Sequence, residues 1–216
     1  MAAPDLVFDG PAKARSTIVL AHGAGAPMDS PFMNTIAGAL GEAGHRVARF
    51  DFPYMARHRE DGRRRPPSTA TALAASWLEV IEHLGAGTLV IGGKSLGGRI
   101  ASLVADEAGV RGLVCLGYPF HPPGKPERLR TAHLETLRTP ALFCQGERDP
   151  FGNAGEVAGY TLSPAIALHW LADGDHGFKP RKASGRTEAE NREQARNAVA
   201  AFLATLAPGH VPGQPG

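Results

Sequence analysis

The amino-acid sequence predicts an α/β domain of three layers, in which a mostly parallel sheet is covered by helices on both faces. Short runs of apolar and β-branched residues alternate along the chain with longer segments whose apolar residues recur at helical spacing. Most of the short runs are apolar throughout, as expected for strands that are buried on both faces of a parallel sheet. The 216 residues are enough for one core, so we expect a single domain over residues 1–207 and a flexible tail over residues 208–216.

The elements follow one another in a regular order. The expected strands, which are apolar and rich in β-branched residues, cover residues 17–21, 47–51, 88–92, 112–117, 141–145 and 166–171. The expected helices cover residues 32–43, 71–84, 96–108, 127–137, 153–160 and 187–206. In the last of these, Ala195, Val199 and Phe202 share one side and charged residues occupy the other. Strands that alternate with helices in this way predict parallel neighbours joined by crossovers.

Composition and charge exclude several classes of protein. The chain is 43% hydrophobic and 20% charged, as in soluble globular proteins, and its net charge of +2 predicts neither a nucleic-acid partner nor attraction to a membrane surface. The first residues lack the pattern of a secretory signal, and no apolar run approaches the roughly 18 residues of a spanning helix. We therefore expect a cytoplasmic protein, monomeric or homodimeric. Cys115 and Cys144 could form a disulfide, but two buried thiols are the simpler interpretation.

The stretch IGGKSLGGR, residues 91–99, has two interpretations. A phosphate-binding loop with its second glycine at Gly93 needs a first glycine at position 88, and that residue is Thr88. The expected strand leaves no room for such a loop before the helix. The pattern Gly-x-Ser-x-Gly is therefore favoured, in which Ser95 occupies a sharp turn between strand and helix and Gly93 and Gly97 allow both to approach it closely.

A nucleophilic serine needs a histidine to accept its proton and a carboxylate to orient that histidine, in the chain order serine, acid, histidine. Asp149 follows an expected strand in the segment QGERDP, and His176 follows the next strand in ADGDHGF. Glu147 is the rival acid, but it comes directly after the turn glycine and is expected to point outward. The alternative for Asp149 is an aspartate that only stabilises the turn before a proline. His169 lies inside a strand and is interpreted as a wall or core residue.

Acyl chemistry also needs donors for a developing oxyanion. The early strand ends in the small-residue loop HGAGAP, whose backbone N–H at Ala24 is expected to act with the N–H of Leu96. His22 is expected to bond the loop rather than to transfer protons. Asp173, Asp175 and His176 lack companions at metal-ligand spacing, so no metal and no cofactor are expected.

Taken together, the segments LAHGAGA, GGKSLGGR, GYPFHPPGKPERLR, QGERDPFG and DHGFKPRK resemble small serine α/β-hydrolases of the dienelactone-hydrolase-like branch. They also resemble a little-characterised group of short hydrolase-like proteins that includes a subunit of a chromatin-modifying acetyltransferase complex. The resemblance spans residues 18–206 and implies an α/β-hydrolase fold with a twisted sheet and Ser95, Asp149 and His176 as catalytic triad. Dienelactone hydrolases have a cysteine where this chain has Ser95, and the antiparallel pair that usually opens the fold is reduced to residues 6–8 before the first parallel strand.

The segment of residues 118–139 is too short for a separate cap domain, so we expect an open site. Candidate substrate-binding residues are Lys94, Tyr54 and His121. Arginines and lysines gather in residues 57–65 and 179–186, which indicates either an anionic substrate or two solvated loops, and the second interpretation is favoured. The sequence thus predicts a hydrolase that cleaves an ester, thioester or related acyl bond of a small molecule. The alternative is a non-catalytic interaction protein that retains the fold.

Overall fold

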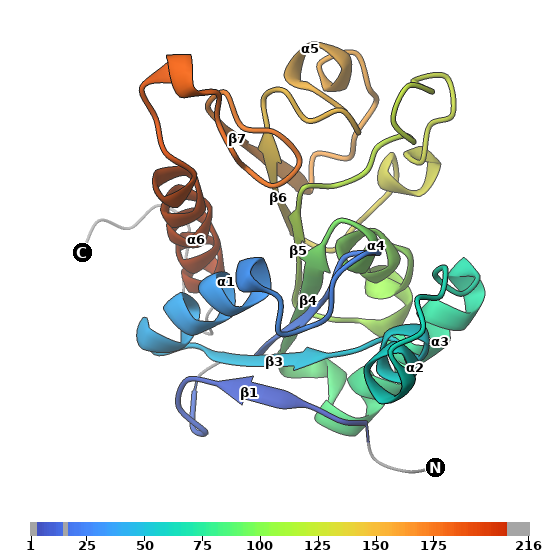
Figure 1. Cartoon of the computed structure of the whole chain (residues 1–216). Helices are drawn as coiled ribbons and strands as arrows, with labels where there is room; N and C mark the ends of the chain where they lie inside the picture. The colour runs from blue at the N-terminus through green and yellow to red at the C-terminus, as the bar shows by residue number, and fades with distance from the viewer. Residues whose placement is uncertain (1–3, 15–16, 207–216) are drawn as a thin grey trace.

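A computed structural model describes residues 4–14 and 17–206 of the chain, so the tail expected at residues 208–216 lies outside the described residues. Seven strands form one sheet in the order β1-β3-β2-β4-β5-β6-β7 (Figure 1). Their bounds are β1 Val7–Asp9, β2 Thr17–Ala21, β3 Arg46–Phe50, β4 Leu89–Lys94, β5 Gly112–Leu116, β6 Ala141–Gly146 and β7 Ile166–Leu171. Only β1 is antiparallel to its neighbour, and the other described pairs are parallel. The expected three-layer, mostly parallel fold is confirmed.

Helices cover both faces of the sheet (Figure 1). They are α1 Pro31–Glu42, α2 Pro53–Asp61, α3 Ala70–Leu84, α4 Leu96–Ala108, α5 Ala154–Val157 and α6 Glu188–Thr205. Consecutive strand residues point to opposite faces, and in β2 Ile18 and Leu20 join the core under α1 and α6 whereas Val19 and Ala21 join the core under α3 and α4. Strands that must be apolar on both sides explain the unbroken apolar runs of the sequence.

Three expectations about the loops are wrong. The helix expected at residues 127–137 contains only a 3-10 turn at Ala132–Leu134, because this segment is tied across a tight loop. The Tyr118 hydroxyl donates to the carbonyl of Arg130, and the N–H of Arg130 donates to the carbonyl of Phe120. The helix expected at residues 153–160 is reduced to the single turn of α5, and the basic segment of residues 57–65, interpreted as a loop, begins inside the helix α2.

The chain between β5 and β6 holds that one 3-10 turn and no α-helix, so no cap domain covers the sheet among the described residues. Within the same residues, no helix combines the length and the apolar composition that a bilayer span requires. Cys115 and Cys144 are buried free thiols.

Candidate active site

Ser95 occupies the turn between β4 and α4 with a backbone conformation that is strained for any residue with a side chain, φ 49° and ψ −110°. Two glycines make the turn fit. A Cβ atom on Gly93 would lie 2.1 Å from the carbonyl oxygen of Ala21, and one on Gly97 would lie 2.3 Å from the same oxygen. The end of β2 therefore packs directly against the turn, and this close approach explains the Gly-x-Ser-x-Gly pattern.

The structure brings Ser95, His176 and Asp149 into one hydrogen-bonded series. The Oγ atom of Ser95 lies 2.8 Å from Nε2 of His176, and Nδ1 of His176 lies 2.8 Å from Oδ2 of Asp149. Asp149 is fully buried and also accepts from Nε2 of Gln145 at 3.0 Å and from the N–H of Phe151 at 2.9 Å. An ionised carboxylate accepts only, so Nδ1 of the histidine carries the proton and Nε2 accepts from the serine hydroxyl.

Glu147, the rival acid, is exposed and accepts a hydrogen bond from the N–H of Asp173, away from His176. The loop that carries His176 is held in shape on both sides. Asp175 accepts from the N–H groups of Gly177 and Lys179, and the ammonium of Lys94 donates to the carbonyl of His176 at 2.5 Å. The same loop contains strained backbone. Among the described residues, the non-glycine residues with positive φ are Asp173 and Phe178 in this loop and Ser95 itself.

The electrostatics of the site favour a neutral histidine. Burial lowers the pKa of His176, and the charge of Lys94 lowers it further, against the opposing effect of Asp149. Burial likewise lowers the pKa of Lys94 to about 8, although Asp149 and Asp175 oppose the shift. At neutral pH the imidazole is thus a free base beside a hydroxyl, as general-base catalysis requires.

His22 anchors the loop after β2 through hydrogen bonds of both ring nitrogens. His22 is fully buried, its Nε2 accepts from the N–H of Phe52 at 3.0 Å, and its Nδ1 donates to the carbonyl of Gly23 at 2.6 Å. The hydroxyl of Tyr54 donates to the carbonyl of Ala24 at 3.1 Å. In the described part of the chain, the N–H groups of Ala24 and Leu96 donate to no protein atom, so both are free to donate to another acceptor.

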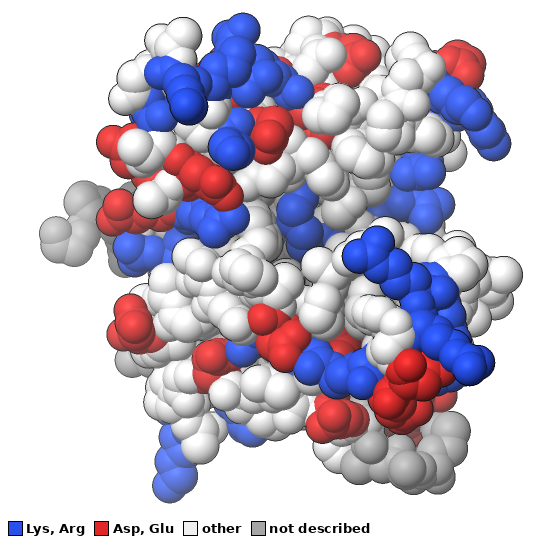
Figure 2. All heavy atoms as spheres, in the orientation of Figure 1, with Lys and Arg blue, Asp and Glu red and all other residues white. Residues whose placement is uncertain are grey.

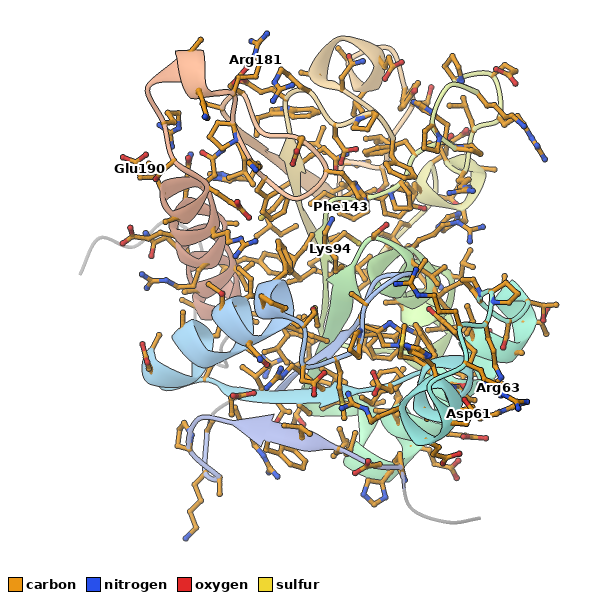
Figure 3. All side chains as sticks on the ribbon, viewed as in Figure 1. Asp61, Arg63, Lys94, Phe143, Arg181 and Glu190 are labelled. Carbon is orange, nitrogen blue, oxygen red and sulfur yellow. The ribbon has the colours of Figure 1, made fainter. Side chains whose placement is uncertain are left out.

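A pocket of about 520 Å³ opens beside Ser95 and His176. Its walls come from the loop after β2, the start of α1, the loops after β6 and β7, and α6. The lining residues are Gly23, Ala24, Gly25, Ala26, Ser30, Pro31, Phe32, Met33, Lys94, Ser95, Phe151, His176, Gly177 and Arg192. Figure 3 shows Lys94 in the middle of the molecule, between the strands and the loops that follow them.

Of the three candidate substrate-binding residues, only Lys94 lines this pocket. Tyr54 is buried behind the loop of Ala24 and faces a separate hollow of about 150 Å³. His121 is also buried. Its backbone N–H donates to the carbonyl of Phe151, and its Nε2 lies 3.3 Å from Oε2 of Glu156. Phe32 and Arg192 line the pocket without any sequence signal, since each lies in a helix whose pattern indicates only packing or solvation.

Part of the positive charge of the basic segments is paired with neighbouring acids. Arg59 pairs with Asp29 and Asp51, Arg65 pairs with Asp61, and Arg181 pairs with Asp173. On the face shown in Figure 2, some Lys and Arg side chains lie beside Asp and Glu, whereas others form continuous basic groups at the top and on the right. Among the described residues, no group of three or more His, Cys, Asp or Glu residues could hold a metal ion.

Comparisons with known proteins identify a family and a fold. The sequence model of a family described as Alpha/beta hydrolase domain matches residues 14–204. A rat (Rattus norvegicus) protein described as a candidate protein-lysine deacylase, ABHD14B, is 31% identical over 118 residues, and the match spans 53% of each chain, about half of the relative's length.

Solved structures resemble the fold over nearly its whole length. A dienelactone hydrolase from Anabaena variabilis has a TM-score of 0.69 and 22% identity, with 92% of this chain and 91% of that chain covered. A protein from Xanthomonas campestris described as an α/β serine hydrolase without lid has a TM-score of 0.62 and 19% identity, with 98% and 91% covered. At these identities the likeness shows the fold, and it agrees with the absence of a cap among the described residues.

Proposed function

Because the chain belongs to the Alpha/beta hydrolase domain family, we propose that it is a serine hydrolase that cleaves an ester, thioester or related acyl bond of a small molecule. The observation that carries the proposal is the hydrogen-bonded series Ser95–His176–Asp149, which opens into a pocket next to two unengaged N–H groups. A serine that only capped a helix would need none of these partners.

The geometry suits a two-step mechanism through an acyl-enzyme. Oγ of Ser95 attacks the substrate carbonyl carbon while its proton passes to Nε2 of His176. The N–H groups of Ala24 and Leu96 stabilise the negative charge on the tetrahedral oxygen, and Asp149 stabilises the imidazolium. The leaving group takes the proton from His176 and departs. Water then repeats the sequence at the acyl-enzyme, and its attack releases the acid and restores the Ser95 hydroxyl.

No cap covers the pocket in the described residues, so the proposed chemistry is not restricted to one kind of leaving group. The rat relative is described as a lysine deacylase, and an amide of a lysine side chain would require the same attack and the same proton transfers. The alternative to any of these reactions is a non-catalytic interaction protein that retains the fold. This alternative predicts a serine without special reactivity.

A fluorophosphonate probe distinguishes the two without knowledge of the substrate. If His176 activates Ser95, the serine oxygen displaces fluoride from phosphorus, its proton passes to His176, and the phosphoryl oxygen takes the place of the oxyanion. We expect one dominant adduct at Ser95, located by digestion and mass spectrometry, and we expect it to disappear in His176→Ala.

Ser102 provides a matched control. Its Oγ lies 2.8 Å from Nε2 of His133, but among the described residues His133 has only Ser102 and Tyr118 as side-chain partners, and Ser102 is buried. Ser102→Ala should label like the unmodified protein. A folded protein that stays unlabelled with probes of several sizes would exclude the hydrolase and favour the interaction protein.

A further inference from the structure

The pocket beside Ser95 carries an excess of positive charge that the hydrolysis of a neutral ester does not require. Its lining includes two cationic side chains, Lys94 and Arg192, and no aspartate or glutamate. The rest of the wall is mainly apolar or small, with Phe32, Met33 and Phe151 as its largest apolar side chains.

The two cations meet at one aromatic ring. Nζ of Lys94 lies 5.4 Å from the centre of the Phe32 ring, and Cζ of Arg192 lies 5.3 Å from the same centre. They come from different parts of the fold, the end of β4 and the second turn of α6. Both positive charges thus lie near the same part of the pocket wall, where each would stabilise an anion bound beside Phe32.

Both cations also retain donors for a ligand. Lys94 uses one donor on the carbonyl of His176, and an ammonium has three. Arg192 pairs with Glu188 through Nη2, but its Nε is buried without a hydrogen-bond partner in the described structure. A buried guanidinium N–H without an acceptor is costly, and a carboxylate oxygen would satisfy it.

We propose, on the basis of the hydrolase function above, that the acyl group accepted by this pocket ends in a carboxylate. The apolar part of the acyl chain lies against Phe32 and Phe151 while its carbonyl is at Ser95, and the terminal carboxylate pairs with Lys94 and Arg192. A monoanion fits better than a dianionic phosphate, because Glu188 already neutralises part of the charge of Arg192. The substrates are thus esters or thioesters of short dicarboxylic acids, rather than of plain fatty acids.

The direct test compares two 4-nitrophenyl esters of equal chain length, one with a methyl end and one with a carboxylate end. We expect kcat/KM to be at least about tenfold higher for the carboxylate ester, since a charged hydrogen bond contributes on this scale. In Arg192→Met and in Lys94→Met this ratio should fall toward one. Arg196→Met, one turn further along α6 and outside the pocket lining, is the matched control and should keep the ratio.

A binding measurement keeps the proposal separate from the proposed function. Ser95→Ala should bind monomethyl glutarate more tightly than methyl pentanoate in calorimetry, whether or not the unmodified protein turns over either ester. Turnover of both esters at equal kcat/KM, or equal binding, would overturn the carboxylate proposal while leaving the hydrolase intact. Preferred binding of the carboxylate by a protein that no fluorophosphonate labels would support the pocket and overturn the hydrolase.

Discussion

Gly97→Ala tests whether the close contact between α4 and β2 holds the site together. The added Cβ atom would lie 2.3 Å from the carbonyl oxygen of Ala21 and 2.8 Å from that of His22. An ordinary contact begins at 3.4 Å, so the end of β2 or the start of α4 must move by about 1 Å. Both contacts are backbone atoms, which cannot swing aside as a side chain can.

This displacement has two expected effects. Overpacking of a well-packed contact costs roughly 1–3 kcal/mol of the free energy of unfolding, and each kcal/mol lowers the Tm of a domain of this size by roughly 2–4 °C. The loop that carries Ala24 follows directly after His22, so the proposed oxyanion donor moves with it. A misplacement of about 1 Å in a catalytic site can reduce the rate roughly 100-fold, and we expect kcat to fall by that order.

The assay is hydrolysis of the best 4-nitrophenyl ester beside a thermal melt. Gly38→Ala is the matched control, because Gly38 lies in the helix α1 with no atom within 4 Å of the added Cβ. That change should raise stability by about 1 kcal/mol through helix propensity and leave kcat unchanged. A Gly97→Ala protein that melts and hydrolyses like the unmodified protein would refute the reasoning about this contact.

Two further predictions concern the triad. Burial and the charge of Lys94 hold the pKa of His176 below the ordinary value of 6.5. The kcat/KM for a neutral ester should therefore be level at pH 7 and decline only below pH 6.5, where the imidazole takes up a proton and ceases to be a base. A decline that begins above pH 7 would contradict a neutral His176. Ser95→Gly should melt at or above Ser95→Ala, because both lack Oγ and only glycine relieves the strained φ of 49°. At Ser76, inside the helix α3, the order should reverse by about 1 kcal/mol, and the same order at both positions would mean that the turn at Ser95 is not strained.

The sequence was most informative where a position has one physical solution. The strands β2 to β6 are buried on both faces, so their apolar runs could be located to within two residues. The spacing of Gly93, Ser95 and Gly97 identified the turn, because a Cβ at either glycine would collide with β2. The order serine, aspartate, histidine then led to Asp149 and His176, which the structure places in hydrogen-bond contact with each other.

The sequence was least informative where tertiary contacts decide. The apolar spacing in residues 127–137 is typical of a helix, yet the bonds of Tyr118 and Phe120 to Arg130 hold that segment as a loop. The sequence made His121 and Tyr54 candidate substrate-binding residues, but neither lines the pocket. His121 instead contacts Glu156, and the Tyr54 hydroxyl donates to the carbonyl of Ala24. Arg192 is one of several charged residues in α6, and only the crossing of α6 with the start of α1 brings it to Phe32.

The order of strands in the sheet has a consequence for how the site comes into being during folding. Ser95 follows β4 at the centre of the sheet, whereas His176 follows β7 at its edge, 81 residues later. Contacts between residues so distant in sequence form late, because much of the chain must be ordered before they can be made. The edge strand is also the first that can detach from a folded sheet. The hydrogen-bonded series from Ser95 to Asp149 is therefore complete only in the fully folded chain. On heating, the proposed activity should be lost before the central strands of the sheet unfold.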